Sequence, residues 1–276
     1  YAVIWVTSTA SKGYIKYSYG GQAYTVYDMR NGIVRTNGTV HVVKVPHEHL
    51  DGNSYTGYSQ EVTKHSYATT TYGATVSKGP ITLKAYDNNP NDFYIMVLTD
   101  VHGKLDWAKN APSRFSDKSD PDPFVFSGDL VDNIVTKASI EKMFNIMGTT
   151  TNGKYPIVYC RGNHELRGGF STMLLEYFPT KTGEFYFDFR YGPLWGVVLD
   201  TGEGSDDPHQ YFGNLANFKN YTQKQEVWLR QLRRDTTATF RFGIYHIPHL
   251  DSYTQFPSSN SQNFIQNGVD YIDSIG

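Results

Sequence analysis

Four short apolar segments of the chain are each followed directly by side chains that can bind metal ions or transfer protons. The segments are predicted strands at 93–99, 124–127, 156–160 and 240–245. After them come Asp100 and His102, then Asp129 and Asp132, then Arg161, Asn163, His164 and Glu165, and finally His246 and His249. Ligand sites in open α/β sheets lie beyond the carboxyl ends of the strands. We therefore expect these side chains to meet at one edge of one sheet.

These residue types suit a pair of metal ions. Carboxylate oxygens bind Mn and Mg, imidazole binds Zn and Fe, and a mixed set of ligands accepts several of these metals. Asp100 and His102 stand two residues apart on backbone that we expect to be extended, where a slight turn brings both onto one ion. A carboxylate such as Asp129 can bridge two ions about 3.5–4 Å apart, the spacing of two-metal hydrolytic sites.

The elements that follow residue 92 must hold this edge in place. Predicted helices at 137–147, 171–178 and 222–234 alternate with the strands, and a further apolar strand is expected at 195–200. Strands that alternate with helices predict an α/β layered domain with a central sheet. A polar run at 87–92 that contains Pro90 marks its boundary, so we place this domain at 93–276.

Residues 1–86 predict strands alone. Seven short segments are rich in β-branched and aromatic residues, and turn pairs such as Asn37-Gly38 and Asp51-Gly52 separate them. The segments lie at 1–7, 13–19, 23–29, 39–45, 54–62, 67–72 and 80–86. Seven short strands in about 90 residues is the number expected of an immunoglobulin-like sandwich. We therefore expect an all-β sandwich domain at 1–87.

Composition excludes several classes of protein. The formal net charge of the 276 residues is −2, so no overall field attracts nucleic acid or an anionic membrane. Apolar stretches fall far short of the about 20 residues of a spanning helix, so no transmembrane segment is expected. The single cysteine excludes an internal disulfide and a zinc–thiolate cluster. With 22 tyrosines and 16 phenylalanines, the chain has the composition of a sheet-rich globular protein.

Four motifs together resemble the calcineurin-like metallophosphoesterase family. They are Asp-x-His at 100–102, Gly-Asp-x-x-Asp at 128–132, Gly-Asn-His-Glu at 162–165 and the strand-terminal His246, in this order. The resemblance covers about residues 93–276 and implies central β-sheets flanked by helices. The segments at 3–7, 13–20, 41–43 and 50–55 resemble the fibronectin-type domain that precedes purple acid phosphatases.

The family resemblance implies a role for each residue of these motifs. The metal ligands would be Asp100 and His102 for the first ion, Asp129 as the bridge, and Asn163 and His246 for the second. His164 would contact phosphate and protonate the leaving alkoxide, and the Asp132 carboxylate would pair with it, raising its pKa and fixing its tautomer. Water would be the nucleophile, and the ions would be two divalent or trivalent metals such as Mn, Fe or Zn.

The sequence departs from the family pattern at two places. The family's closing Gly-His-x-His motif is absent after His249, and we expect it to lie beyond Gly276 in a longer chain. Purple acid phosphatases have Gly at the place of His102 and a metal-binding Tyr at the place of Asp132. The tyrosine-to-iron charge transfer that colours those enzymes is therefore not expected here.

Some residues near the motifs have two interpretations. Arg161 would either contact phosphate or pair with a structural carboxylate, and the two are equally favoured. His249 would touch substrate or lie in a surface loop, and the loop is favoured. Glu165 is expected to support its loop rather than react. The acidic segment 203–207, which begins with Glu203, is expected to be an ordinary loop rather than an ion site or a gate.

The predicted function is hydrolysis of small phosphate monoesters at a dinuclear metal site. Phosphodiesterases and nucleotidases share the same motifs, and a non-catalytic surface or binding protein with a degenerate phosphoesterase domain is the alternative of another class. The sandwich domain, the abundance of Thr, Asn and Tyr and the absence of an N-terminal Met favour a secreted or cell-envelope protein, of bacterial type. The lone cysteine is equally compatible with the cytoplasm, and the sequence does not define the oligomeric state.

Overall fold

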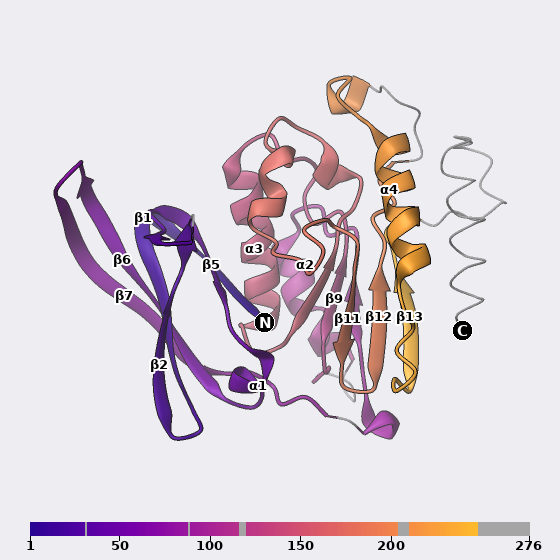
Figure 1. The fold of residues 1–276 in the computed structure, drawn as a ribbon, viewed down its shortest axis with the longest axis horizontal. Coiled ribbons are helices and arrows are strands. Elements are labelled where there is room, and N and C mark those ends of the chain that lie inside the picture. Colours follow the sequence, from indigo (N-terminus) through magenta and orange to yellow (C-terminus); the bar gives the residue numbers. More distant parts are fainter. Residues whose placement is uncertain (31, 88, 116–119, 204–209, 248–276) are drawn as a thin grey trace.

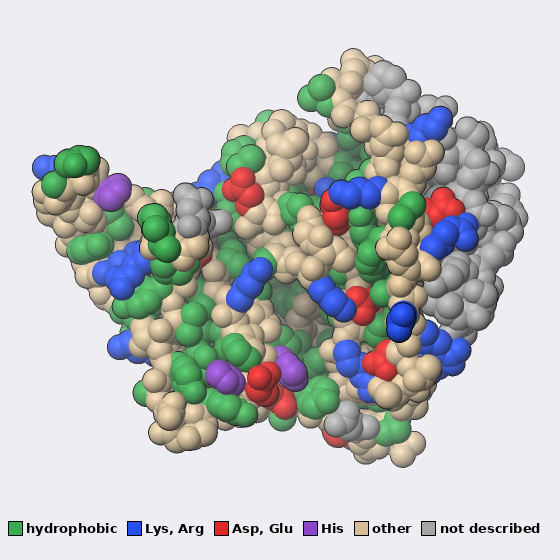
Figure 2. Space-filling view, viewed as in Figure 1, with side chains coloured by type: hydrophobic (Ala, Val, Ile, Leu, Met, Phe, Trp, Pro, Cys, Tyr) green, Lys and Arg blue, Asp and Glu red, His purple; other side chains and the backbone are tan. Residues whose placement is uncertain are grey.

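The computed structural model describes residues 1–30, 32–87, 89–115, 120–203 and 210–247. A β-rich part formed by the first 86 residues lies beside a layered part that contains the helices α2, α3 and α4 (Figure 1). Hydrophobic, positive and negative side chains are interspersed over the face shown in Figure 2, as the near-zero net charge leads one to expect. Within the described residues, no helix has both the length and the apolar character needed to cross a membrane.

The β-rich part is built mainly on one antiparallel sheet. Its strands are β1 (Ala2–Tyr19), β2 (Gln22–Tyr27), β5 (Gly38–Lys44), β6 (Ser54–His65) and β7 (Thr70–Thr82). The short strands β3 (Met29–Arg30) and β4 (Val34–Arg35) form a separate ribbon, and α1 (His47–Leu50) is a single turn of helix. The all-β character expected for this region is therefore present.

The long strand β1 takes part in both layers of this sheet. Its first residues pair with β5, and its later residues pair with β2 and β6, with a register shift between Val6 and Ser11. The two halves enclose an apolar core in which Val43 of β5 packs with Ile15 and Tyr17 of β1.

The expected strands at 1–7 and 13–19 are thus one continuous strand, and the expectation of two separate strands is wrong. No glycine or proline interrupts residues 7–12, so nothing forces the extended backbone to end there. Likewise β7 replaces the strands expected at 67–72 and 80–86. The fibronectin-type assignment and the domain boundary at 87–93 stay predictions.

Within the described residues, the layered part contains two three-stranded sheets. In the first, the parallel strands lie in the order β10 (Ile157–Cys160), β9 (Phe124–Ser127), β8 (Met96–Leu98). In the second, β12 (Leu194–Val198) lies between its antiparallel partner β11 (Phe187–Tyr191) and its parallel partner β13 (Phe240–Ile244). Val125 and Val158 of the first sheet share a buried cluster with Val198 of the second, so the sheets pack face to face.

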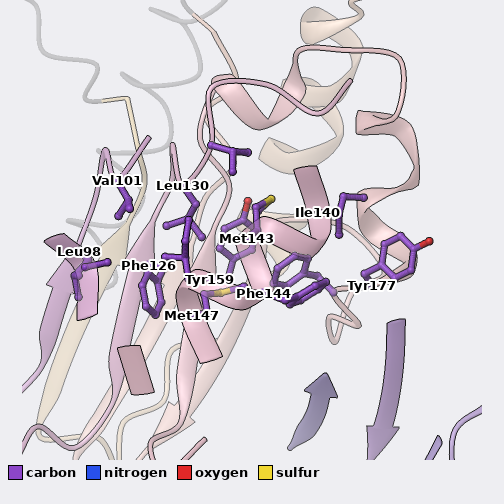
Figure 3. Packing of buried hydrophobic residues seen from close by; sticks show 14 of the residues in the cluster. Leu98, Val101, Phe126, Leu130, Ile140, Met143, Phe144, Met147, Tyr159 and Tyr177 are labelled. Atoms are coloured by element: carbon purple, nitrogen blue, oxygen red, sulfur yellow. The ribbon is translucent and has the colours of Figure 1, made fainter. Parts of the chain in front are cut away.

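Helices cover the outer faces of both sheets. The longer ones are α2 (Leu105–Asn110), α3 (Lys137–Thr151) and α4 (Phe218–Gln231), and the 3-10 turns are η1 (Pro90–Asp92), η2 (Pro112–Arg114), η3 (His164–Leu166), η4 (Ser171–Glu176) and η5 (Gln210–Phe212). Met143 and Phe144 of α3 lie in one buried cluster with Phe126 of the first sheet (Figure 3). Leu229 of α4 packs against Trp195 of the second. The mixed α/β architecture is confirmed, with η4 in place of the helix expected at 171–178.

The β-rich part packs directly on α3. Val40 of β5 belongs to the same buried cluster as Met143. Tyr55 donates a hydrogen bond of 2.8 Å from Oη to the main-chain oxygen of Gly153, just after α3. Thr39 Oγ1 donates to the Glu141 carboxylate at 2.9 Å. The two parts therefore share a packed and hydrogen-bonded junction.

Candidate metal centre

The four expected strand ends meet at one edge of the layered part. The loops after β8 and β9 are joined by main-chain hydrogen bonds from Asp100 N to Gly128 O (3.1 Å) and from His102 N to Asp129 O (2.9 Å). His246 follows β13 and donates from Nδ1 to the Ser127 main-chain oxygen at the end of β9 (2.7 Å). The motifs thus converge as expected, but not on one sheet: β8, β9 and β10 belong to the first sheet, whereas β13, which leads to His246, belongs to the second.

Three of the predicted ligands have left-handed backbone. The φ angles are +54° at Asp100, +46° at His102 and +55° at Asp129. This corrects the expected extended backbone between Asp100 and His102. Residues other than glycine rarely adopt such angles, and strain of about 1–3 kcal/mol per residue persists only where the surroundings enforce it. Such strain clusters at functional sites, which supports a site here on grounds independent of side-chain type.

Glu165 enforces part of this backbone. Its buried carboxylate accepts hydrogen bonds from the main-chain N–H groups of Asp129 (2.9 Å), Leu130 (2.6 Å) and Gly162 (2.9 Å). Burial and the neighbouring Asp129 carboxylate raise the pKa of Glu165 above its ordinary value, although these N–H groups stabilise the charged form. Glu165 thus joins the loops after β9 and β10, as expected of a supporting residue.

The Asp129 carboxylate lies at the centre of the cluster. Its Oδ2 is 3.3 Å from Nε2 of His246, 3.7 Å from Nε2 of His164 and 3.9 Å from Nε2 of His102. Its Oδ1 accepts a hydrogen bond of 3.0 Å from the main-chain N–H of His164. Asp100 Oδ1 lies 3.8 Å from His102 Nε2. One buried carboxylate therefore faces three imidazoles that come from three different loops.

This donor set fits metal ions. Ligand atoms about 2.0–2.2 Å from one ion lie about 3–4 Å from each other, which matches the separations around Asp129. Among the described residues, two groups have their ligand atoms within 4.8 Å of one another: Asp100, His102 and Asp129, and His102, Asp132 and His164. Carboxylates mixed with imidazoles suit Mn, Fe or Zn.

His246 is held in one orientation toward Asp129. Burial disfavours its charged form, but the hydrogen bond and charge of Asp129 outweigh burial and raise the pKa of His246 to about 9. Although burial opposes ionisation of Asp129, its interactions with His246 and His164 lower the pKa of that carboxyl. Without a metal, the two side chains therefore form an ion pair at neutral pH.

The expected pairing of the Asp132 carboxylate with His164 is wrong. Asp132 Oδ1 lies 2.9 Å from Nδ1 of His102, whereas Nδ1 of His164 lies 2.8 Å from the main-chain oxygen of Asp132. The cause is that His164, at the start of η3, faces the main chain of this loop while the exposed Asp132 side chain turns the other way. The carboxylate orients a predicted metal ligand, an arrangement common around metal-bound histidines.

Arg161 serves as a structural partner rather than a phosphate ligand. Its guanidinium forms an ion pair with the buried Asp200 carboxylate and lies 4.1 Å from the ring centroid of Phe185. Tyr221 Oη donates to the same carboxylate at 2.9 Å. These contacts are the ones that its structural interpretation expects. His249, the other expected substrate contact, lies outside the described residues.

Arg167 was missed by the sequence interpretation, and Glu203, which was expected to begin an ordinary acidic loop, also lies at the site. Arg167 Nη1 lies 2.9 Å from Nε2 of His164, and its Nη2 donates to Glu203 Oε2 at 2.8 Å. Glu203 Oε2 also accepts from Asn163 Nδ2 at 2.9 Å. A signal existed for both: Arg167 follows His164 by three residues, one turn of a 3-10 helix, and Glu203 lies beyond the end of a strand.

The comparisons with known proteins agree with this geometry. Residues 93–272 match the family model described as Calcineurin-like phosphoesterase. A search among curated proteins found no match. The matched segment covers well over half of the chain and includes every motif residue that meets at the strand ends. The chain therefore belongs to the calcineurin-like phosphoesterase family.

Proposed function

We propose that this protein hydrolyses phosphate monoesters with water activated at a dinuclear metal site. The observation that carries the proposal is the Asp129 carboxylate, buried at the strand ends with three imidazole Nε2 atoms 3.3–3.9 Å away. Family membership supports metal-dependent phosphoester hydrolysis. The preference for monoesters and the use of two ions are parts of our proposal.

The proposed ligands are those that the motifs indicated. Asp100 and His102 would hold one ion, Asn163 and His246 the other, and Asp129 would bridge them. The hydrogen bond from Asn163 Nδ2 to Glu203 leaves the amide oxygen available as the ligand. Bound Mn, Fe or Zn would supply acidification of a water molecule and neutralisation of phosphoryl charge.

His164 is the proposed proton donor to the leaving alkoxide. Because the Asp132 main-chain oxygen can only accept, it fixes the hydrogen on Nδ1 of His164 and leaves Nε2 facing Asp129. Proton transfer to the leaving group would therefore occur from a protonated Nε2. Asp132, first expected to pair with His164, is proposed as a positioning residue for His102.

The proposal is tested with the full-length protein purified in the presence of Mn²⁺. We expect about two metal ions per chain by elemental mass spectrometry, and faster hydrolysis of p-nitrophenyl phosphate than of bis(p-nitrophenyl) phosphate. Faster diester hydrolysis would favour a phosphodiesterase. Less than one Mn, Fe or Zn per chain would favour the non-catalytic binding protein. Secretion or a cell-envelope location is part of the proposal and is tested by cell fractionation.

A further inference from the structure

Arg167 places a positive charge beside the imidazole cluster. Its Nη1 lies 2.9 Å from His164 Nε2 and its Nη2 donates to Glu203 at 2.8 Å, while its Nε has no partner among the described residues. The side chain is 25% exposed. Glu203 therefore anchors Nη2 of the guanidinium, and Nη1, which lies beside His164, is the nitrogen that faces the cluster.

The contact with His164 shows where this guanidinium points. The Asp132 main-chain oxygen accepts from Nδ1 of His164, so in this contact Nε2 accepts a hydrogen bond from Arg167 Nη1. The same Nε2 lies 3.7 Å from Asp129 Oδ2. When Nε2 carries the proton that the proposed function requires, it can no longer accept from Arg167. Nη1 is then available to a phosphoryl oxygen at the centre of the cluster, where that group would have to lie to react.

Glu203 ties Arg167 to a proposed metal ligand. One oxygen of its carboxylate, 10% exposed as a side chain, accepts both from Arg167 Nη2 and from Asn163 Nδ2. Hydrogen bonds between ionised groups are short and orient both partners. The position of the guanidinium is therefore coupled to that of the Asn163 amide.

We propose that Arg167 binds a non-bridging oxygen of a dianionic phosphoryl group and so sets a preference for phosphate monoesters over diesters, with Glu203 as its positioning residue. This inference rests on the proposed function. A monoester presents three non-bridging oxygens and two charges, so one oxygen remains for Arg167 when two face the metals. A diester has one charge fewer and carries a second carbon substituent in place of that oxygen.

The first test measures phosphate binding rather than activity. In the Mn²⁺-loaded protein, Arg167→Ala should weaken binding of inorganic phosphate by about 10- to 100-fold in calorimetry, the effect of losing a charge-assisted hydrogen bond. Arg190→Ala is the matched control, since Arg190 pairs with Asp235 outside the site. It should leave phosphate binding unchanged, and both variants should bind Mn²⁺ like the parent protein.

The second test compares the two ester classes. The ratio of kcat/KM for p-nitrophenyl phosphate to that for bis(p-nitrophenyl) phosphate should fall in Arg167→Ala by about the factor by which phosphate affinity falls. Arg167→Lys keeps the charge without the planar fork, so its ratio should lie between those of the parent protein and Arg167→Ala. Glu203→Gln keeps an acceptor and should resemble the lysine variant, whereas Glu203→Ala should approach Arg167→Ala.

The outcomes separate this inference from the function on which it rests. If the parent protein binds metal and cleaves esters but Arg167→Ala retains its phosphate affinity and its ester ratio, only the inference fails. An equal loss on both esters, with Arg167→Lys as impaired as Arg167→Ala, would make Arg167 a structural residue and overturn the inference. If the parent protein binds no metal and cleaves neither ester, the proposed function and the inference fail together.

Discussion

Buried histidine and carboxylate side chains face each other in two regions of the described structure, and only one of them has the character of a catalytic site. In the β-rich part, the fully buried His41 lies with Nδ1 3.5 Å from Asp28 Oδ2, and its ring packs 5.0 Å from that of Trp5. At the strand ends, Asp129 faces three imidazoles.

The difference lies in what surrounds each pair. His41 and Asp28 have ordinary backbone and are sealed from solvent, whereas Asp129 has left-handed backbone and its neighbours His102 and His164 are partly exposed. Residue type alone does not distinguish the two regions. The site is identified by the convergence of several loops, by backbone strain and by the access of solvent to its side chains. The predictions below test that distinction.

Asp129→Asn should have the largest effect. It removes the charge that three imidazoles face, so hydrolysis should fall by at least about 10³-fold, the scale on which a member of a catalytic unit is lost. Metal content measured by mass spectrometry should fall with it, while far-ultraviolet circular dichroism should keep the native spectrum. Unchanged turnover would mean that the site is elsewhere.

His41→Ala should show the opposite of Asp129→Asn: it should lose stability and keep its activity. Removing the fully buried imidazole leaves a cavity beside the Trp5 ring, so the free energy of unfolding should fall by about 2–4 kcal/mol in urea titrations. Metal content and kcat should stay at the parent values under conditions where the variant is folded. Loss of activity in a variant that keeps its stability would abolish the distinction between the two regions.

His246 should give the metal-free protein a characteristic pH dependence. Its pKa is raised to about 9 by Asp129, so its stabilising effect is complete below the ordinary value of 6.5 and is lost as the pH rises through 9. In the presence of a chelator, the free energy of unfolding should fall by about 1–3 kcal/mol between pH 6.5 and 9.5.

His246→Gln is the control for this dependence and should remove most of it. Metal binding must displace the same proton, so metal affinity should increase with pH up to about 9. A parent protein whose stability is flat across this range would contradict the ion pair between His246 and Asp129.

Asp132→Ala should have the smallest effect. Loss of its contact with Nδ1 of His102 should weaken metal binding by about 10- to 100-fold, as for other partners of metal-bound histidines. Asp132→Asn keeps a side-chain acceptor and should lose less metal affinity than Asp132→Ala. A change in the pH profile of hydrolysis without a change in metal affinity would instead support the pairing with His164 that the sequence suggested.

Much of the site could be predicted from the sequence because the positions of the strand ends are dictated by patterns of apolar residues. Asp100, Asp129 and His246 each follow such a strand. Parallel pairing of β8 with β9 brings the first two to one edge, and the packing of the second sheet on the first brings His246 there. The supporting role of Glu165 followed from its place inside the same loop. These inferences needed only the position of the main chain.

What could not be predicted depends on the directions of side chains and on contacts between distant loops. Whether the Asp132 carboxylate turns to His102 or to His164 is decided by one rotamer. The orientation of the Arg161 guanidinium is set by its ion pair with Asp200, 39 residues further along the chain. Glu203 is hydrogen-bonded to Arg167 from 36 residues away, a contact that no strand pattern indicates. The continuity of β1 was missed because a bend without glycine or proline leaves no local signal.

The most direct test of the account is a crystal structure of the Mn²⁺-loaded protein with anomalous diffraction recorded near the metal edge. We expect two anomalous peaks that flank the Asp129 carboxylate, about 3.5–4 Å apart. Peaks that are absent from this cluster, or that lie beside His41 and Asp28 instead, would contradict it.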